Sequence, residues 1–266
     1  MDPYAITAGA AALLFLVVWL VSLALRDASV VDLIWGAGFA LLAWVAWSQA
    51  PDAEPARLVL PILSTVWGLR LSLYLTYRNW GQGEDPRYVA IRARNQPFWL
   101  KSLWIVFGLQ AALQWLISLP LLSVQRGLLE APSALSSVAL ALGAVLFGLG
   151  LLCESAADVQ LARFKADPAN AGQVMDRGLW RYSRHPNYFG DFLVWWGFYV
   201  IAIAQGAPLW TVISPLVMSG LLLKVSGVPL LEARLRETRP AYADYVARTS
   251  AFFPWRPKPA SASTGA

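Results

Sequence analysis

Charged residues are scarce in this sequence, and cysteine and histidine are almost absent. Only 14% of the 266 residues are charged, against about 25% in a soluble domain. Cys153 is the one cysteine, which excludes an intrachain disulfide framework and a cysteine-based zinc cluster. His185 is the one histidine, so a multi-histidine metal site is excluded too. We therefore expect a surface that faces lipid, and no metal centre.

The sequence contains several long apolar runs. Apolar residues make up 58% of the chain, and Trp, which favours the membrane–water interface, occurs 14 times. A membrane-spanning helix needs about 20 mostly apolar residues. We predict an all-α, polytopic membrane bundle of about seven transmembrane helices, at 6–25, 30–47, 58–77, 100–122, 135–153, 189–204 and 209–223.

Basic residues are distributed unequally between alternate connections. Lys and Arg cluster after the first, third and fifth runs and in the tail from Arg234 to Lys258, whereas the opposite connections contain only Arg57 and Arg126. Cytoplasmic loops carry the excess of Lys and Arg. We predict an integral membrane protein, with its N-terminus outside and its C-terminus cytoplasmic. Because the basic residues lie between apolar runs, we expect no nucleic-acid partner.

No internal repeat divides the chain, so we predict a single transmembrane domain over 1–266. Residues 257–266, rich in Pro, Ser and Ala, are expected to form a disordered tail. The loops assigned to the cytoplasm are the longer ones, and they are rich in Arg, Asn, Tyr and Asp. A soluble anionic molecule should bind on that side.

Several charged residues lie in or near the apolar runs, where each costs about 2.5–3.5 kcal/mol on insertion scales. Structural pairing or snorkelling would explain any single one of them. Together they favour a polar cavity. They are Asp32, Arg70, Glu154, Asp158, Asp191, Lys224 and Glu232.

The segment 178–191 is the densest polar motif. Arg184, with Arg181, can neutralise phosphate through its guanidinium group, and Pro186 begins a helix whose free N–H groups also attract anions. Asn187 supplies an amide for paired hydrogen bonds, and Gly190 permits close approach of a flat ligand ring. The alternative is an interfacial anchor of Arg, Trp and Tyr.

Two further features have a structural interpretation beside a functional one. His185 is more often a structural hydrogen-bonding residue in such a loop than a general acid or base. The loop 77–88 mixes charge with aromatics, and it is either a lid over a cofactor or an ordered juxtamembrane loop.

These motifs resemble the membrane steroid 5α-reductase family, most closely its bacterial members. The resemblance covers 148–255 well and 66–88 moderately, whereas 1–60 matches mainly in hydropathy. Its marks are Asp158 with Lys165, the segment 178–191, Lys224 with Glu232, and the segment 66–70 followed by Tyr74 and Asn79.

The resemblance implies that NADPH is the cofactor, held among the C-terminal spans and cytoplasmic loops. Residues 126–256 would then form the cofactor-binding half and residues 1–125 the substrate-pocket half. The likeness to bacterial members implies the bacterial inner membrane as the location. A pyrophosphate and a 2′-phosphate need cations, while ribose hydroxyls and the nicotinamide amide need Asp, Asn and Tyr. The cofactor-binding residues expected are Arg70, Asn79, Asp158, Lys165, Tyr182, Arg184, His185, Asn187, Asp191, Lys224 and Glu232.

The resemblance further implies hydride transfer to the C=C bond of an apolar enone from the bilayer, most simply a Δ4-3-ketosteroid. No obligate protein partner is evident. The family has a Glu in the second span and a Tyr three residues before the arginine, where this chain has Asp32 and Trp67. We expect Asp32 or Tyr74 to donate the proton, and Trp35 and Trp67 to bind substrate. The alternative is that Asp32 only pairs with Arg70.

Two other functions remain open. The pattern Arg-His-Pro-x-Tyr-x-Gly from Arg184 to Gly190 also resembles membrane methyltransferases that use S-adenosylmethionine on isoprenylcysteine or phospholipids. The third hypothesis is a protein that is not an enzyme, such as a transporter or a sterol-sensing protein. A transporter would favour broken helices in paired positions of two repeated halves, which the sequence lacks.

Overall fold

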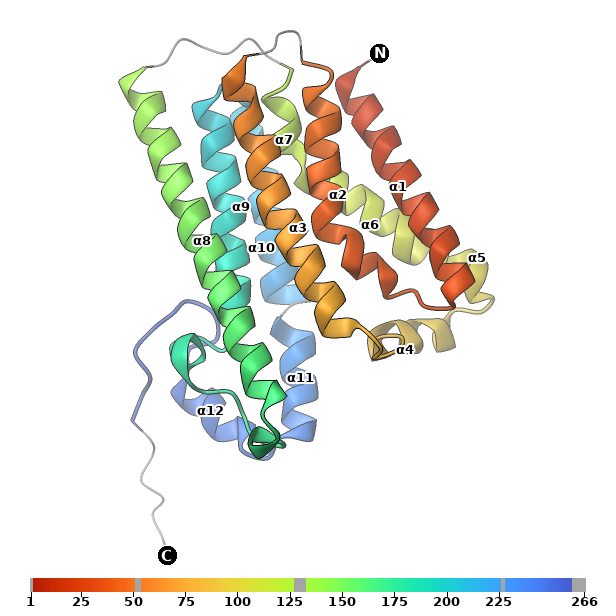
Figure 1. Ribbon diagram of the computed structural model, residues 1–266, viewed down its shortest axis with the longest axis vertical. Helices are drawn as coiled ribbons and strands as arrows, with labels where there is room; N and C mark the ends of the chain where they lie inside the picture. Colours follow the sequence, from red (N-terminus) through yellow and green to blue (C-terminus); the bar gives the residue numbers. More distant parts are fainter. Residues whose placement is uncertain (1, 51–53, 127–132, 226–227, 260–266) are drawn as a thin grey trace, which may run out of the picture. The chain divides into compact units, whose positions relative to one another are not determined.

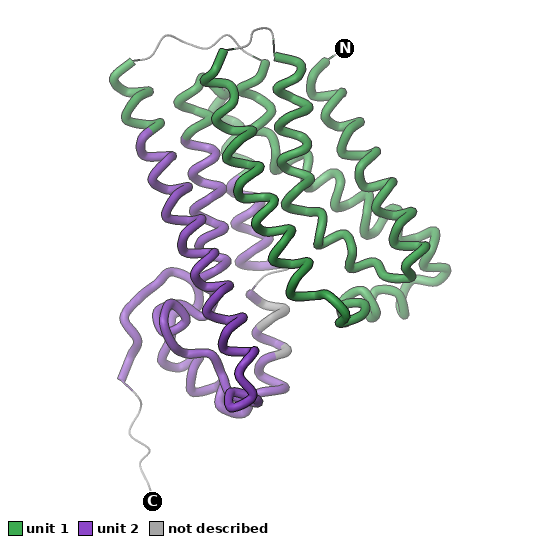
Figure 2. The backbone as a smooth tube through the Cα atoms, viewed as in Figure 1, with its two compact units in different colours: residues 1–140, 201–214 green, residues 141–200, 215–266 purple. Residues whose placement is uncertain are grey.

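The computed structural model describes residues 2–50, 54–126, 133–225 and 228–259, and these ranges contain helices but no strand. The all-α class is therefore confirmed. The chain forms two compact units (Figure 2): unit 1 is Met1–Leu140 with Ile201–Ser214, and unit 2 is Ala141–Val200 with Pro215–Ala266. The division into functional halves stays a prediction. Most of the predicted tail, 260–266, lies outside the described residues.

Unit 1 contains the N-terminal helices (Figure 1). They are α1 (Pro3–Leu25), α2 (Val30–Trp47), the 3-10 turn η1 (Pro55–Leu58), α3 (Val59–Asn79), α4 (Pro86–Arg94), α5 (Phe98–Ser102), the π-helical turn η2 (Leu103–Gly108), α6 (Leu109–Ile117) and α7 (Leu119–Ser123). The start of α8 (Ala134–Ala166), the end of α9 (Pro186–Ala204) and the 3-10 turn η5 (Leu209–Val212) complete it.

Local sequence explains the boundaries of these helices. Pro3 occupies the first turn of α1, and the Asp2 carboxylate caps it by accepting a hydrogen bond from the N–H of Tyr4 at 3.0 Å. The helix ends at Arg26, whose φ of 55° is left-handed. Helix α4 begins in the same way as α1, because the Asp85 carboxylate accepts from the N–H of Arg87 at 2.9 Å.

Two glycines let α2 and α3 touch backbone to backbone. A Cβ on Gly68 would collide with the carbonyl oxygen of Gly36, and a Cβ on Gly36 would collide with that of Gly68. Beside this contact, the backbone N–H of Ala37 donates to Ser72 Oγ at 3.0 Å. Small residues at such a crossing allow van der Waals contact between helices that face lipid, where the hydrophobic effect between helices is weak.

Gly68→Ala should therefore destabilise unit 1. Alanine gains about 1 kcal/mol over glycine in a helix interior, but overpacking a contact between backbones costs about 1–3 kcal/mol, so we expect a net loss. Gly9→Ala in α1 is the control, since a Cβ there meets nothing within 4 Å. Thermal unfolding of both purified variants measures the difference, and equal stability of the two would refute the packing argument.

Unit 2 contains most of α8 and α9, the two 3-10 turns η3 (Pro168–Asn170) and η4 (Gly178–Arg181), the later part of α10 (Ile213–Gly220), the π-helical turn η6 (Leu221–Val225), α11 (Val228–Thr238) and α12 (Tyr242–Arg248). Gly190 has a packing role here. A Cβ on Gly190 would lie 2.5 Å from the backbone nitrogen of Glu154, so α9 approaches the α8 backbone itself. The expected space for a ligand ring is thus filled by α8.

Five helical segments in the described ranges are long and apolar enough to cross a membrane, which identifies an integral membrane protein. They are Pro3–Leu25, Val30–Trp47, Pro55–Asn79, Phe98–Ile117 and Ala134–Ala166. The predicted count of seven is not confirmed. Polar residues such as Asn187 and Asp191 interrupt the apolar character of α9, and the predicted run 209–223 falls within the shorter apolar segment Leu209–Val225.

Candidate functional site

The start of α9 faces α8 in unit 2. Pro186 is the first residue of α9, and the next residue, Asn187, donates from Nδ2 to Asp158 Oδ1 of α8 at 3.3 Å. Asp158 is buried and Asn187 half-buried. Gly178 has a φ of 58°, and the adjacent N–H of Leu179 donates to Gln160 Oε1 at 2.9 Å. Side chains of α8 thus hold both ends of the polar motif.

Arg184 is held by protein groups on several sides. Its Nε donates to Glu232 Oε1 at 2.8 Å, and its Nη1 donates to the carbonyl of Thr249 at 2.7 Å. Its backbone N–H donates to the carbonyl of Ser250 at 2.9 Å. The guanidinium, which the sequence suggested for phosphate, therefore braces α11 and the end of α12.

His185 belongs to the same brace, which we call the Arg184–His185–Glu232 brace. It is completely buried, and its Nε2 lies 3.1 Å from Glu232 Oε1. Because the carboxylate accepts, the proton is assigned to Nε2. The ring stacks on Tyr188, with centroids 5.6 Å apart and planes 6° from parallel. These contacts favour the structural interpretation of His185 over general acid–base catalysis.

Burial and neighbouring charges shift the pKa values of the two titrating residues of the brace, His185 and Glu232. Burial lowers the pKa of His185 from its ordinary value, and the hydrogen bond with Glu232 offsets this only in part. For Glu232, burial by itself raises the pKa, but hydrogen bonds from Arg184 and His185 outweigh it and hold the pKa below its usual value. At neutral pH the brace thus combines a neutral imidazole with an ionised carboxylate.

Acidification should destabilise unit 2 through His185. The pKa of His185 is lower in the folded protein than in the unfolded chain, where it is about 6.5. Its contribution to folding stability is therefore fully present above about pH 6.5 and is lost as the pH falls toward the pKa of the folded state. Because His185 is the one histidine, this step belongs to a single residue. Thermal stability measured from about pH 8 to about pH 5 should fall below about pH 6.5. His185→Gln should lack that step, and an identical pH profile in the variant would contradict the assignment.

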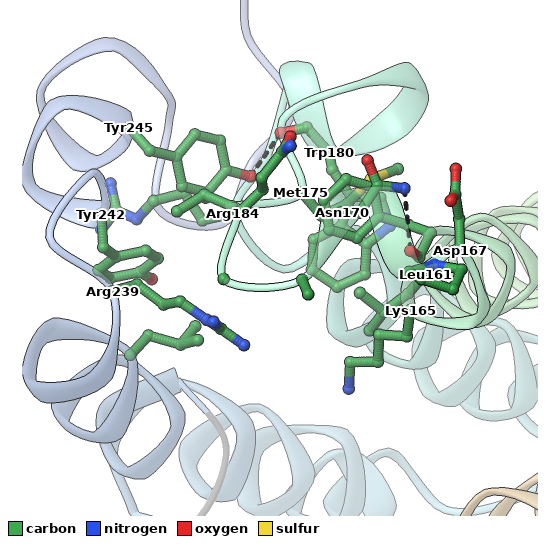
Figure 3. A pocket seen from close by; sticks show the side chains of 17 residues that line it. Leu161, Lys165, Asp167, Asn170, Met175, Trp180, Arg184, Arg239, Tyr242 and Tyr245 are labelled. Atoms are coloured by element: carbon green, nitrogen blue, oxygen red, sulfur yellow. Dashed lines mark hydrogen bonds between the residues drawn. The ribbon is translucent and has the colours of Figure 1, made fainter.

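A cavity of about 220 Å³ lies in unit 2 beside the brace. It extends from the end of α8 across the loop 167–175 to α11 and α12. Figure 3 shows the side chains of Lys165 and Arg239 extending into the same space from different segments. Arg239 makes no ion pair among the described residues. Arg239 was missed in the sequence because its cavity partner, Lys165, is more than seventy positions away.

Aromatic side chains form part of the cavity wall. The Tyr245 hydroxyl donates to the carbonyl of Trp180 at 2.5 Å (Figure 3). Trp180 Nε1 donates to the carbonyl of Ala157 at 3.1 Å, so both rings are fixed. Tyr242 is 1% exposed, and burial raises its pKa to about 12. Its hydroxyl lacks a hydrogen-bond partner within the described ranges. The cavity therefore combines two cations with flat apolar walls and a buried hydroxyl.

One face of α8 links the cavity to Asn187. Asp158, Leu161 and Lys165 are spaced by three and four residues, so they lie on the same helix face. Leu161 and Lys165 line the cavity, while Asp158 binds Asn187.

Among the other residues predicted for unit 2, Asp191 is half-buried in α9, Tyr182 is 43% exposed and Lys224 is exposed.

Asp32 has different partners from the one considered in the sequence. Its carboxylate accepts from Arg87 Nη2 and from the Tyr88 hydroxyl, both at 2.7 Å. The alternative in which Asp32 pairs with Arg70 is therefore wrong. Asp32 lies in the first turn of α2, and its partners belong to α4. Burial and the carboxylate of Asp32 raise the pKa of Tyr88, which keeps its hydroxyl protonated as a donor.

The remaining residues predicted for the site lie along α2 and α3. Trp67 is fully buried against Phe39, with ring centroids 5.8 Å apart, and the ring centroid of Trp35 lies 4.9 Å from that of Phe39. The guanidinium carbon of Arg70 lies 5.9 Å from the centroid of the Tyr74 ring. Asn79 Oδ1 accepts from Arg78 Nε at 3.0 Å. These residues belong to unit 1, so their assembly with the unit 2 cavity into one site stays a prediction.

The loop 77–88 is ordered by contacts within unit 1. Glu84 accepts from the backbone N–H of Ala28 at 2.8 Å and from Arg92 Nη2 at 2.7 Å. Burial alone raises the pKa of Glu84, but the hydrogen bonds from Arg92 and Ala28 lower it overall. These contacts support the juxtamembrane-loop interpretation.

Comparison with known proteins places the chain in a family. It is similar to a Schizosaccharomyces pombe protein described as "Uncharacterized protein C594.04c", with 29% identity over 264 residues, covering 90% of this chain and 76% of the yeast protein. No solved structure matches the chain. Residues 18–249 match the model of a family described as "Protein of unknown function (DUF1295)", which includes steroid 5α-reductase-like proteins, and the chain belongs to this family.

Proposed function

We propose that this protein is an NADPH-dependent membrane reductase that transfers hydride to the C=C bond of an apolar enone, most simply a Δ4-3-ketosteroid. The observation that carries the proposal is the unit 2 cavity, where Lys165 and Arg239 face one space between aromatic walls. A phosphorylated adenine nucleotide offers a matching pattern of dianionic phosphate and flat ring. When bound, NADPH would supply the hydride.

Each group of residues has a distinct part in this proposal. Lys165 and Arg239 would hold the phosphate of the adenosine end, with Trp180 and Tyr242 beside the ring. Asn187, oriented by Asp158, would present its amide to the nicotinamide carboxamide. The Arg184–His185–Glu232 brace would keep α11 and α12 in place behind the cavity. The cavity would face the cytoplasm, with the N-terminus of the chain outside.

The contacts of unit 1 favour Tyr74 over Asp32 as the proton donor. Both carboxylate oxygens of Asp32 are already engaged, because they accept hydrogen bonds from Arg87 and from Tyr88. Tyr74 has a hydroxyl group, and the guanidinium carbons of Arg70 and Arg78 lie 5.9 and 6.0 Å from its ring centroid. Positive charge at this distance stabilises the oxygen that remains after proton transfer.

Tyr74→Phe should then cut turnover of a Δ4-3-ketosteroid at least about tenfold, since positioned acids contribute about 10²–10⁴-fold. NADPH affinity should change little, because the ring remains. Asp32→Asn should instead lower thermal stability, since the amide keeps only one acceptor oxygen for the two donors Arg87 and Tyr88. Steady-state turnover and thermal unfolding of both variants separate the roles. Full turnover in Tyr74→Phe would remove Tyr74 from the mechanism.

Binding of nucleotides to the purified full chain tests the proposal as a whole. Calorimetry with NADPH, NADH and S-adenosylmethionine should give tight binding only for NADPH. Tight binding of S-adenosylmethionine with no binding of NADPH would establish the methyltransferase alternative, which the sequence around Pro186 supports. If the protein binds none of the three compounds, the result would favour the third hypothesis, a protein that is not an enzyme.

A further inference from the structure

A second cavity, of about 250 Å³, lies in unit 1 where α1 ends and α5 begins. The residues that matter in its wall are Ser22, Arg26, Arg92, Phe98, Trp99 and Ser102. Leu25 ends one candidate membrane span, and Phe98 begins another. A cavity between these two residues lies at the boundary between the hydrocarbon and the aqueous phase.

The positive charge in this cavity is only partly balanced. Arg92 is neutralised by Glu84, whose two carboxylate oxygens lie 2.7 and 3.0 Å from its Nη2 and Nε. Arg26 is exposed and makes no ion pair within the described part of the chain. The neighbouring Asp27 carboxylate instead accepts from the N–H and the hydroxyl of Ser29, at 2.8 and 2.5 Å. One guanidinium thus remains available to an anion.

The rest of the wall is fixed and has the character of a membrane interface. Trp19 Nε1 donates to the carbonyl of Trp99 at 3.1 Å and to Ser102 Oγ at 3.2 Å, which ties α1 to α5. The guanidinium carbon of Arg92 lies 4.3 Å from the centroid of the Phe98 ring. Trp99 is 58% exposed. An exposed indole next to a cation is the arrangement that favours the headgroup region of a bilayer.

We propose that this cavity binds the headgroup phosphate of an anionic phospholipid. The Arg26 guanidinium matches a phosphate in charge and in hydrogen-bonding geometry, and the hydroxyl of Ser22 or Ser102 can complete the contact. The exposed face of Trp99 then borders the glycerol and the first part of an acyl chain. Anionic lipids of the cytoplasmic leaflet attract basic residues next to spanning helices. This inference is independent of the proposed reductase activity.

Retention of lipid by the full-length protein tests the proposal. Purified protein is titrated with phosphatidylglycerol or phosphatidylcholine and examined by native mass spectrometry. Phosphatidylglycerol should bind in preference, and Arg26→Gln should weaken it about fivefold, the factor that corresponds to ~1 kcal/mol for one basic residue at an anionic surface. Arg26→Lys should retain most of the affinity. Arg94→Gln is the matched control, because Arg94 is exposed but does not line the cavity.

Two outcomes would overturn the proposal. In the first, phosphatidylglycerol binds to Arg26→Gln as it does to the unchanged protein, while thermal unfolding shows that the variant is folded. In the second, inorganic phosphate displaces the lipid at equal concentration, which would make the cavity a simple anion site. A photoreactive phosphatidylglycerol should label peptides containing Trp99 or Ser22, and labelling confined to other segments counts against the site.

Discussion

Glu232→Gln lowers the stability of unit 2 by about 3 kcal/mol, because removing one partner of a buried ion pair leaves the other charge uncompensated. Arg184 and Glu232 have side chains only 10% and 11% exposed, and His185 is completely buried beside them. The substitution keeps the shape of the side chain and removes its charge. Arg184 then has only uncharged acceptors, which are the amide oxygen at position 232 and the carbonyl oxygens of Thr249 and Val246.

Glu237→Gln on the same helix is the matched control. Glu237 is exposed, so its loss should change stability by less than about 0.5 kcal/mol. Thermal unfolding of the two purified variants and the unchanged protein measures both effects. Equal stability of Glu232→Gln and Glu237→Gln would show that the brace contributes nothing to unit 2.

Much of the fold follows from local sequence. The run from Pro3 to Leu25 is largely apolar, so a spanning helix is predicted at 6–25, and the capping Asp2 before Pro3 explains why the helix begins three residues earlier. The later helices are harder. Helix α9 carries Asn187 and Asp191, whose polarity reduces its apolar character. Its apolar part predicts a helix at 189–204, whereas the contact of Asn187 with Asp158 is known only from the fold.

In the candidate site, the sequence indicates which side chains need a partner but does not identify the partner. A sequence can indicate that a buried carboxylate such as Asp32 needs a partner, but several arginines are available. The pairing with Arg87 depends on the direction in which α4 leaves α3. Gly190 likewise allows a close approach, and only the packing identifies the α8 backbone as its neighbour. Motifs indicated the unit 2 residues, whereas Arg239 belongs to no motif and appears only in the folded cavity.

If the protein is the proposed NADPH-dependent reductase, removing both cations of the unit 2 cavity should abolish a preference for NADPH over NADH. Each charge-assisted hydrogen bond contributes about 1.5–3 kcal/mol, so Lys165→Ala with Arg239→Ala should weaken NADPH binding about a hundredfold or more. NADH lacks the 2′-phosphate, and its affinity should change far less. The two affinities, measured by calorimetry on the purified protein, should therefore converge.

Arg177→Ala is the control for general charge, because Arg177 is exposed in the same region but does not line the cavity. The loss in the double variant should also grow as salt is lowered, since screening of the phosphate is then weaker. Each single variant should give an intermediate loss. If the double variant keeps its affinity for NADPH and still reduces a ketosteroid, the reductase proposal stands and the phosphate lies elsewhere. If neither the unchanged protein nor the double variant binds NADPH, the cavity serves another ligand and the reductase proposal fails with it.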